Sequence, residues 1–95
     1  AGEAGDPELP LSALGLRRYV AADYPRAAAA RDAAGWVEVG FRVDAKGRPR
    51  DVRVLAAEPA GEFDAAALAA VRRWRFDPPP AGVEPRTRVR VRFTP

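Results

Sequence analysis

The sequence contains no cysteine and no histidine. Without cysteine, neither a disulfide nor a thiolate metal site can form, and the composition fits an oxidising or a reducing compartment alike. Without histidine, the commonest general base and metal ligand of proteins is missing. The only serine, Ser12, therefore has no histidine to activate it. These absences argue against an enzyme, and we expect no catalytic residue, no bound metal and no cofactor.

Long hydrophobic runs are missing as well. No stretch approaches the ~20 apolar residues of a membrane span, and no signal peptide is recognisable. The 95 residues, of which 47% are apolar, are enough for one domain with a modest core. Sixteen basic and 13 acidic residues leave a net charge of only +3. That mildly basic balance is a weak argument for nucleic acid.

Turn-forming residues divide the chain. Residues 1–11 are small, acidic and interrupted by two prolines, which predicts the flexible end of a linker. Residues 12–22 could form a short helix capped by Ser12, although a glycine weakens it. Residues 23–95 hold the regular hydrophobic patterns and are predicted to form the folded domain.

Two segments of this domain have helical patterns. Residues 23–35 predict a helix that begins near Pro25, runs through four alanines and ends at Gly35. Residues 62–76 predict the clearest helix, because apolar residues recur there at helical spacing. The apolar stripe comprises Phe63, Ala67, Ala70 or Val71, and Trp74. Of these, Phe63 and Trp74 are predicted to lie in the core.

Three segments alternate as strands do. Residues 36–43 and 48–56 are predicted to form a hairpin around a turn at 44–47, where Gly47 suits a positive φ angle. Residues 86–93 form the last predicted strand. The side chains predicted to face inward are Val37, Val39, Phe41, Val43, Val52, Val54, Thr87, Val89, Val91 and Phe93.

Each strand has only one apolar face, so the sheet is predicted to be antiparallel and covered on one side. Both helices must then lie on that side. The predicted fold is therefore an α+β two-layer sandwich, a three-stranded antiparallel sheet with two helices packed on one face. We expect Trp36 and Glu38 on the opposite face, and Gly40 in mid-strand predicts a bulge or a close approach.

The spacing of these residues resembles a known family. The resemblance rests on Tyr24-Pro25-x-x-Ala28, Gly35-x-Val37-x-Val39-x-Phe41-x-Val43, Gly47, Val52-x-Val54, the run from Phe63-Asp64 through Arg72-Arg73-Trp74-Arg75-Phe76 to Pro78, and Phe93. From about residue 23 to 94, the chain resembles the C-terminal domain of the TonB-type periplasmic energy transducer family of Gram-negative cell envelopes.

The resemblance implies an adaptor in the periplasm, anchored in the inner membrane by a segment that we expect to precede this sequence. Such a domain binds the TonB box of an outer-membrane TonB-dependent transporter by strand addition. Through its anchor, the implied protein receives work derived from the proton-motive force from the ExbB–ExbD complex. That work drives active uptake of siderophores, cobalamin or similar cargo.

The resemblance also implies where the partner binds: along the edge formed by the last strand, with a second contact beside the Tyr-Pro pair. The predicted partner-binding residues are Arg86, Thr87, Arg88, Val89, Arg90, Val91, Arg92, Asp23, Tyr24 and Pro25. The strand backbone is predicted to matter more than the guanidinium groups, so that Val89→Pro weakens binding more than Arg90→Ala.

Three interpretations of the four arginines on this strand are open. They could discourage edge-to-edge aggregation, contact an acidic partner strand or lipid headgroups, or bind nucleic acid. The last is the weakest, because nucleic-acid sites usually add aromatic stacking or a larger charge excess, and we expect no nucleic-acid partner. For the whole domain, the alternative is a TolA-like or other envelope protein-interaction scaffold of the same fold. The exposed edge also leaves room for a homodimer.

Overall fold

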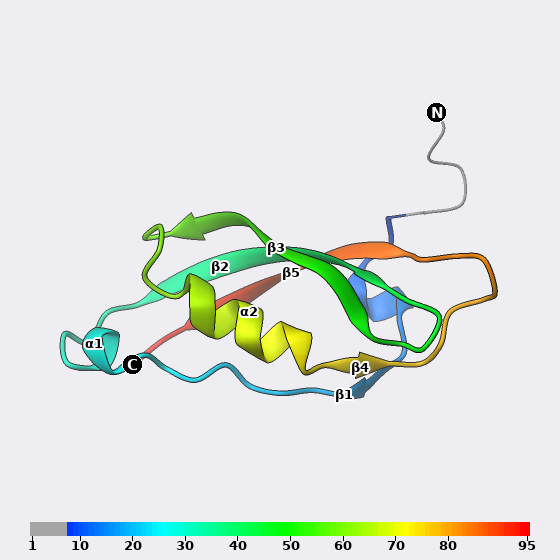
Figure 1. The fold of residues 1–95 in the computed structure, drawn as a ribbon. Coiled ribbons are helices and arrows are strands. Elements are labelled where there is room, and N and C mark those ends of the chain that lie inside the picture. The colour runs from blue at the N-terminus through cyan, green and yellow to red at the C-terminus, as the bar shows by residue number, and fades with distance from the viewer. Residues whose placement is uncertain (1–7) are drawn as a thin grey trace.

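The sheet is built around one buried strand. The computed structural model describes residues 8–95, and its central strand β2 (Gly35–Val43) pairs antiparallel with β3 (Pro49–Glu58) and with β5 (Arg86–Phe93) (Figure 1). The strand order β3-β2-β5 makes β3 and β5 the two edges of the sheet. The last strand of the chain is therefore an edge strand.

Alternate side chains of the strands point into the hydrophobic core. The inward positions predicted on β2 and β5 are buried or half-buried: Val37, Val39, Phe41, Val43, Thr87, Val89, Val91 and Phe93. Val52 and Val54 on β3 are half-buried and pack against the rim of the core. The predicted irregularity at Gly40 is confirmed, because the β2–β3 register shifts on both sides of it and a Cβ there would lie 2.9 Å from Leu55 Cδ1.

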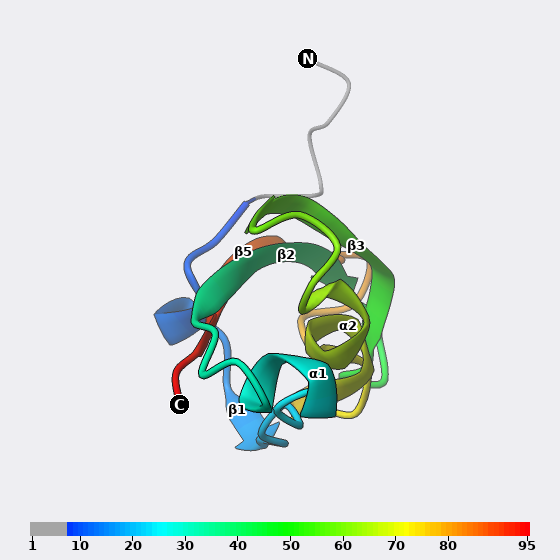
Figure 2. The same ribbon diagram turned by 90° about the vertical axis from the view of Figure 1, so that its left-hand side faces the viewer.

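Helix α2 (Asp64–Arg72) covers the inner face of the sheet. It packs against β2 and β3, and Figures 1 and 2 show it beneath the arched sheet. Phe63, just before the helix, stacks on Phe93 of β5 with 4.5 Å between ring centroids. The second helix, α1 (Arg26–Ala29), is a single turn with one buried residue, Ala28. The predicted α+β class, with a three-stranded antiparallel sheet and two helices, is confirmed.

Both helices are shorter than the sequence pattern predicted. The helix predicted at residues 62–76 ends at Arg72. The chain beyond it is extended as β4 (Arg75–Phe76), and the Phe76 N–H donates a hydrogen bond to the Gly47 carbonyl oxygen at 2.8 Å. A partner from outside the helix therefore replaces the helical hydrogen bond at this position.

The helix predicted at residues 23–35 is reduced to the single turn of α1. The turn closes early, because Asp32 takes a left-handed conformation with a φ of 50°. Gly35, which was predicted to end the helix, instead begins β2. A Cβ on it would lie 2.5 Å from the Glu58 carbonyl oxygen, so the close approach of β3 requires a glycine there.

A second, two-stranded sheet was not predicted. It consists of β1 (Leu16–Arg18) and β4, and a 3-10 turn, η1 (Leu11–Ala13), precedes it. The 3-10 turn and β1 lie at residues 11–13 and 16–18, in the region where the sequence pattern allowed a short helix. Of the linker end predicted at residues 1–11, residues 1–7 lie outside the described residues. No helix in the described part of the chain is long and apolar enough to cross a membrane.

The predicted hairpin turn is confirmed. Gly47 has a φ of 79°, and the Asp44 carboxylate accepts hydrogen bonds from the backbone N–H groups of Lys46 and Arg48, each at 2.9 Å. Burial alone raises the pKa of the Asp44 carboxyl. The two N–H donors and the charges of Arg48 and Arg50 outweigh that effect and hold the pKa below its ordinary value of 3.8.

Candidate functional site

Strand β5 has one paired side and one side that is largely free. On the paired side, the Val43 N–H donates to the Pro85 carbonyl oxygen at 3.0 Å; on the opposite side, the Leu9 N–H donates to the Arg86 carbonyl oxygen at 2.7 Å. Successive residues of a strand direct their backbone groups to opposite sides. The residues whose N–H and C=O groups face the free edge are therefore Arg86, Arg88, Arg90 and Arg92.

This alternation corrects one expectation about the strand. Val89 lies opposite Val39 in the β2–β5 ladder and directs its N–H toward β2. Proline at that position would remove a hydrogen bond of the sheet itself and would damage the fold. Arg90 is the position at which proline removes a donor from the free edge alone.

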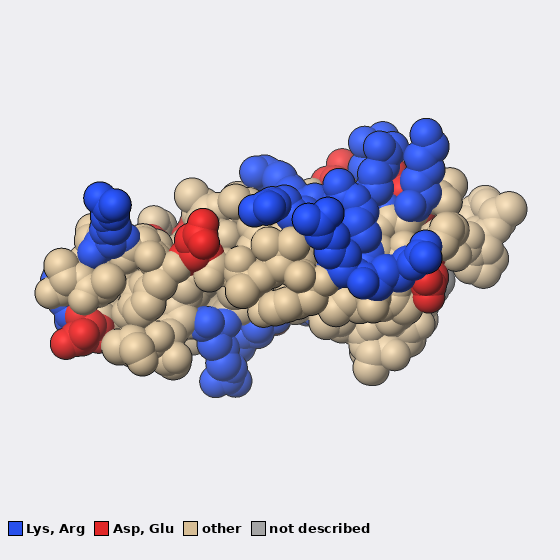
Figure 3. Space-filling model, turned by 90° about the horizontal axis from the view of Figure 1, so that it is seen from below, with Lys and Arg blue, Asp and Glu red and all other residues tan. Residues whose placement is uncertain are grey.

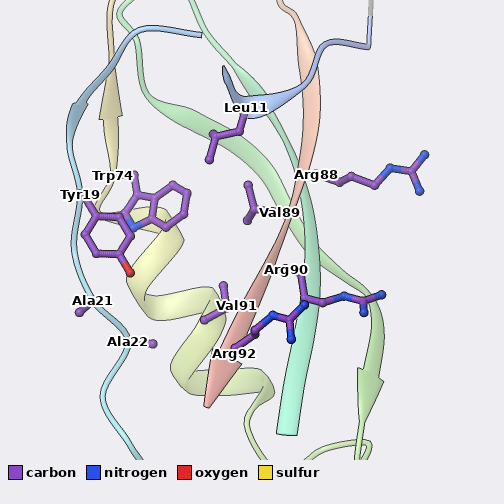
Figure 4. Close-up of a pocket in the computed structure, with 10 residues that line it drawn as sticks. All are labelled: Leu11, Tyr19, Ala21, Ala22, Trp74, Arg88, Val89, Arg90, Val91 and Arg92. Carbon is purple, nitrogen blue, oxygen red and sulfur yellow. The ribbon is translucent and has the colours of Figure 1, made fainter. Parts of the chain in front are cut away.

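A groove with a volume of about 440 Å³ follows the free edge. Its walls are β5 from Arg88 to Arg92 on one side and the extended segment at residues 19–22 on the other, and Trp74 and Leu11 also line it. Figure 4 shows Val89 directed toward Trp74, whereas the side chains of Arg88 and Arg90 point away to the other face. The groove is therefore apolar inside and basic along its outer rim.

Trp74 holds the second wall in place. Its indole N–H donates to the Val20 carbonyl oxygen at 2.8 Å, although the two residues are 54 positions apart in the sequence. The centroids of the Tyr19 and Trp74 rings are 5.2 Å apart, and Tyr19 is 63% exposed. The predicted burial of Trp74 is confirmed at 4% exposure. One core residue thus positions the chain that faces β5 across the groove.

The beginning of β5 is covered by the chain's own residues 8 and 9. Glu8 and Arg86 form a parallel bridge, which the Leu9 hydrogen bond supports. The Glu8 carboxylate accepts a hydrogen bond from Arg88 Nε at 3.0 Å and forms an ion pair with Arg88 Nη2 at 2.9 Å. Beyond Arg88, no described residue makes a backbone hydrogen bond to the free side of β5.

The arginines of β5 form a row on the outer face of the sheet. In the β2–β5 register, Arg90 lies opposite Glu38 and Arg92 opposite Trp36, which confirms the outward placement of both β2 residues. The Arg90 guanidinium lies 3.9 Å from the centroid of the Trp36 ring, a cation–π contact that orients it. Within residues 8–95, no carboxylate forms an ion pair with Arg90 or Arg92.

The predicted site residues separate into two groups. All seven from β5 lie on one strand, and those from Arg88 to Arg92 line the groove. Asp23, Tyr24 and Pro25 do not line it: the Tyr24 hydroxyl donates to the Ala33 carbonyl oxygen and its ring packs 6.0 Å from Phe63, so this residue anchors α1 to the core.

In the groove wall formed with Ala21 and Ala22, sequence reasoning missed Tyr19. Its weak signal was an aromatic residue in a segment without regular periodicity.

Basic side chains are not confined to β5. Figure 3 shows Lys and Arg gathered mainly toward one end of the face seen from below, with Asp and Glu groups beside several of them. Arg72 and Arg73, which are exposed at the end of α2, are two basic residues outside β5. Charge alone therefore does not single out the groove. What distinguishes it is the unpaired backbone of β5.

An α+β domain with an unpaired edge strand beside a groove is the class of domain that can bind an extended segment by strand addition. Comparison with known proteins agrees with that class. The family model described as the Gram-negative bacterial TonB protein C-terminal matches residues 20–95, and the chain belongs to this family.

Several relatives are similar to the chain. Protein TonB of Pseudomonas aeruginosa is 41% identical over 59 residues, which are 62% of this chain and 17% of that protein. Protein TonB of Escherichia coli is 42% identical over 55 residues, or 58% of this chain and 23% of that protein. The chain thus spans less than a quarter of the length of these relatives.

Solved structures agree as well. The solution structure of the Pseudomonas aeruginosa TonB C-terminal domain superimposes with a TM-score of 0.78 at 32% identity, covering 92% of this chain and 93% of that one. The TonB2 protein from Vibrio anguillarum superimposes with a TM-score of 0.62 at 30% identity, covering 77% and 73%.

Proposed function

We propose that the chain is the partner-binding domain of an energy transducer, which binds the TonB box of an outer-membrane transporter by adding it as a strand to the free edge of β5. The observation that carries the proposal is the unpaired backbone at Arg88, Arg90 and Arg92, next to an apolar groove. The family match supports this function over a TolA-like scaffold of the same fold.

Backbone pairing accounts for only part of the binding. Three residues with two edge-facing groups each allow up to six hydrogen bonds, which contribute about 3–9 kcal/mol at ~0.5–1.5 kcal/mol each. Association costs at least ~4 kcal/mol, so the backbone alone gives at most about −5 kcal/mol, weaker than micromolar binding. Side chains that enter the groove or meet its rim must supply the remainder and thereby select the transporter.

The proposal extends to the cellular setting. The domain works in the periplasm, and a part of the protein outside this chain anchors it in the inner membrane and couples it to the ExbB–ExbD complex. Work from the proton-motive force passes through β5 to the transporter for uptake of siderophores, cobalamin or similar cargo. We expect the helices to pack as a second layer on one face of the sheet, an arrangement that suits this role because it leaves the edge of β5 accessible.

A titration followed by NMR tests the proposal. The ¹⁵N-labelled chain is titrated with a peptide that carries the TonB box of an outer-membrane transporter from the same organism. We expect chemical-shift changes concentrated on residues 88–92 and 19–22. Arg90→Pro should abolish them because it removes an edge-facing N–H, whereas Arg90→Ala should retain most of the binding. A peptide that binds both variants equally, or shifts only other surfaces, would contradict strand addition at β5.

A further inference from the structure

The two faces of the groove differ in chemistry. A strand added to β5 would place its side chains alternately on the inner and the outer face, and residues beside each other in a sheet share a face. Partner residues beside Val89 and Val91 would point inward, where Trp74 and Leu11 line the groove. Partner residues beside Arg90 and Arg92 would point to the arginine row.

The chain itself shows what such a strand looks like. Residues 8 and 9 pair with the first residue of β5, and their side chains already alternate. Glu8 places its carboxylate 2.9 Å from Arg88 Nη2, whereas Leu9 is half-buried and lines an apolar pocket with Phe76 and Val83. An acidic residue on the outer face and an apolar residue on the inner face are thus compatible with this edge.

The row of arginines on β5 continues past Arg88, which pairs with Glu8, to Arg90 and Arg92. Arg90 and Arg92 form no ion pair with a carboxylate of residues 8–95, although Glu38 lies opposite Arg90 in the register. Trp36 holds the Arg90 guanidinium on the outer face. Two residues along a strand span about 6.6 Å, which is the same repeat in β5 and in any strand paired with it. Carboxylates two residues apart would therefore each meet one arginine.

We propose that the partner of this groove is an extended segment in which acidic residues alternate with apolar ones, the acidic residues beside Arg90 and Arg92 and the apolar ones beside Val89 and Val91. This inference rests on the proposed strand addition at β5. It assigns the arginines a selective role, while the backbone supplies the docking common to any extended segment.

Three peptides of one length test the selectivity. They alternate valine with glutamate, with glutamine or with lysine, and each is titrated into the ¹⁵N-labelled chain. Two exposed ion pairs predict that the glutamate peptide binds about 2- to 30-fold more tightly than the glutamine peptide at low salt, with the lysine peptide weakest. The advantage should shrink at high salt, because exposed ion pairs are screened.

Charge reversal supplies the matched control. In the double variant Arg90→Glu/Arg92→Glu, the lysine peptide should become the tightest of the three. Arg72→Glu/Arg73→Glu changes the net charge by the same amount at exposed positions that do not line the groove, so the original order should persist. A reversed order in this control as well would show that only net charge acts, and would overturn the proposed pairing.

The two proposals fail in different ways. If glutamate and glutamine peptides shift the β5 edge with equal affinity at low salt, the arginine row selects nothing and the inference is wrong, while strand addition stands. If none of these peptides and no TonB-box peptide shifts the edge, strand addition itself is wrong and the inference fails with it.

Discussion

Replacing Trp74 tests whether one side chain supports both the core and the groove. Its ring meets Phe41 edge-on with 6.4 Å between centroids, and its residue is 4% exposed. Its indole N–H also holds the Val20 carbonyl oxygen at 2.8 Å, which keeps the segment at residues 19–22 opposite β5. Removing the ring should therefore reduce stability, and removing the N–H alone should loosen the groove wall.

The two effects differ in size. Trp74→Ala should cost about 3–5 kcal/mol of the free energy of unfolding, since it leaves a cavity in the core. For a domain of this size, each kcal/mol shifts Tm by about 4–8 °C, so the fall should be about 12–40 °C. Trp74→Phe keeps an aromatic ring but loses the hydrogen bond, which is worth about 0.5–1.5 kcal/mol, or about 2–12 °C.

Thermal melts monitored by circular dichroism measure the first effect, and a peptide titration at a temperature where both proteins are folded measures the second. Trp74→Phe should weaken the peptide more than its small loss of stability explains. Tyr19→Phe, which changes an exposed residue of the same wall without touching the indole hydrogen bond, is the control. A Trp74→Ala protein that melts like the parent would refute this packing, and unchanged peptide affinity in Trp74→Phe would refute the role of Val20 in the groove.

Two further predictions concern the hairpin turn. Gly47→Ala should cost more than the ~1–2 kcal/mol of a left-handed alanine, because the new Cβ would lie 2.0 Å from the Phe76 carbonyl oxygen. Gly82→Ala, with a φ of 80° and no atom within 4 Å of its Cβ, should cost only the conformational part, and equal losses in urea denaturation would contradict the close approach. Asp44 has a lowered pKa in the folded state, so its contribution to stability is present above pH 3.8 and is lost as the pH falls through the folded pKa. The difference in unfolding free energy between the parent and Asp44→Asn should therefore be largest near neutral pH and shrink on acidification, and a difference that grows in acid would contradict it.

The strands with strict alternation could be predicted from the sequence. Hydrophobic burial on one face fixes the orientation of residues 36–43 and 86–93, and no other part of the chain has to be known for that step. The turn at Gly47 could also be predicted from the sequence, because its backbone conformation depends only on neighbouring residues.

The elements that were predicted wrongly or not at all are those whose structure depends on distant parts of the chain. The strands β1 and β4 have three and two residues, too few to show a period. The end of α2 depends on a hydrogen bond to Gly47, and the groove wall depends on Trp74 reaching Val20. Neither contact leaves a local pattern. The Tyr-Pro pair was assigned to the partner site by family resemblance. Tyr24 packs against Phe63 and does not line the groove, and the partner contact of this pair stays a prediction.

The arginine row also reconciles two interpretations that looked like alternatives. Suppose that two copies of the chain joined their β5 edges in one continuous antiparallel sheet. Edge-facing residues pair with edge-facing residues in such a sheet, and on β5 all of these are arginines. Arginine would then lie beside arginine on the same face, which is unfavourable, so this homodimer is disfavoured. The same row favours a strand that brings carboxylates to it. Protection from self-association and selection of an acidic partner thus follow from one arrangement of charge. A mixture of the Arg90→Glu/Arg92→Glu variant with the parent should therefore associate more than the parent alone, as measured by sedimentation.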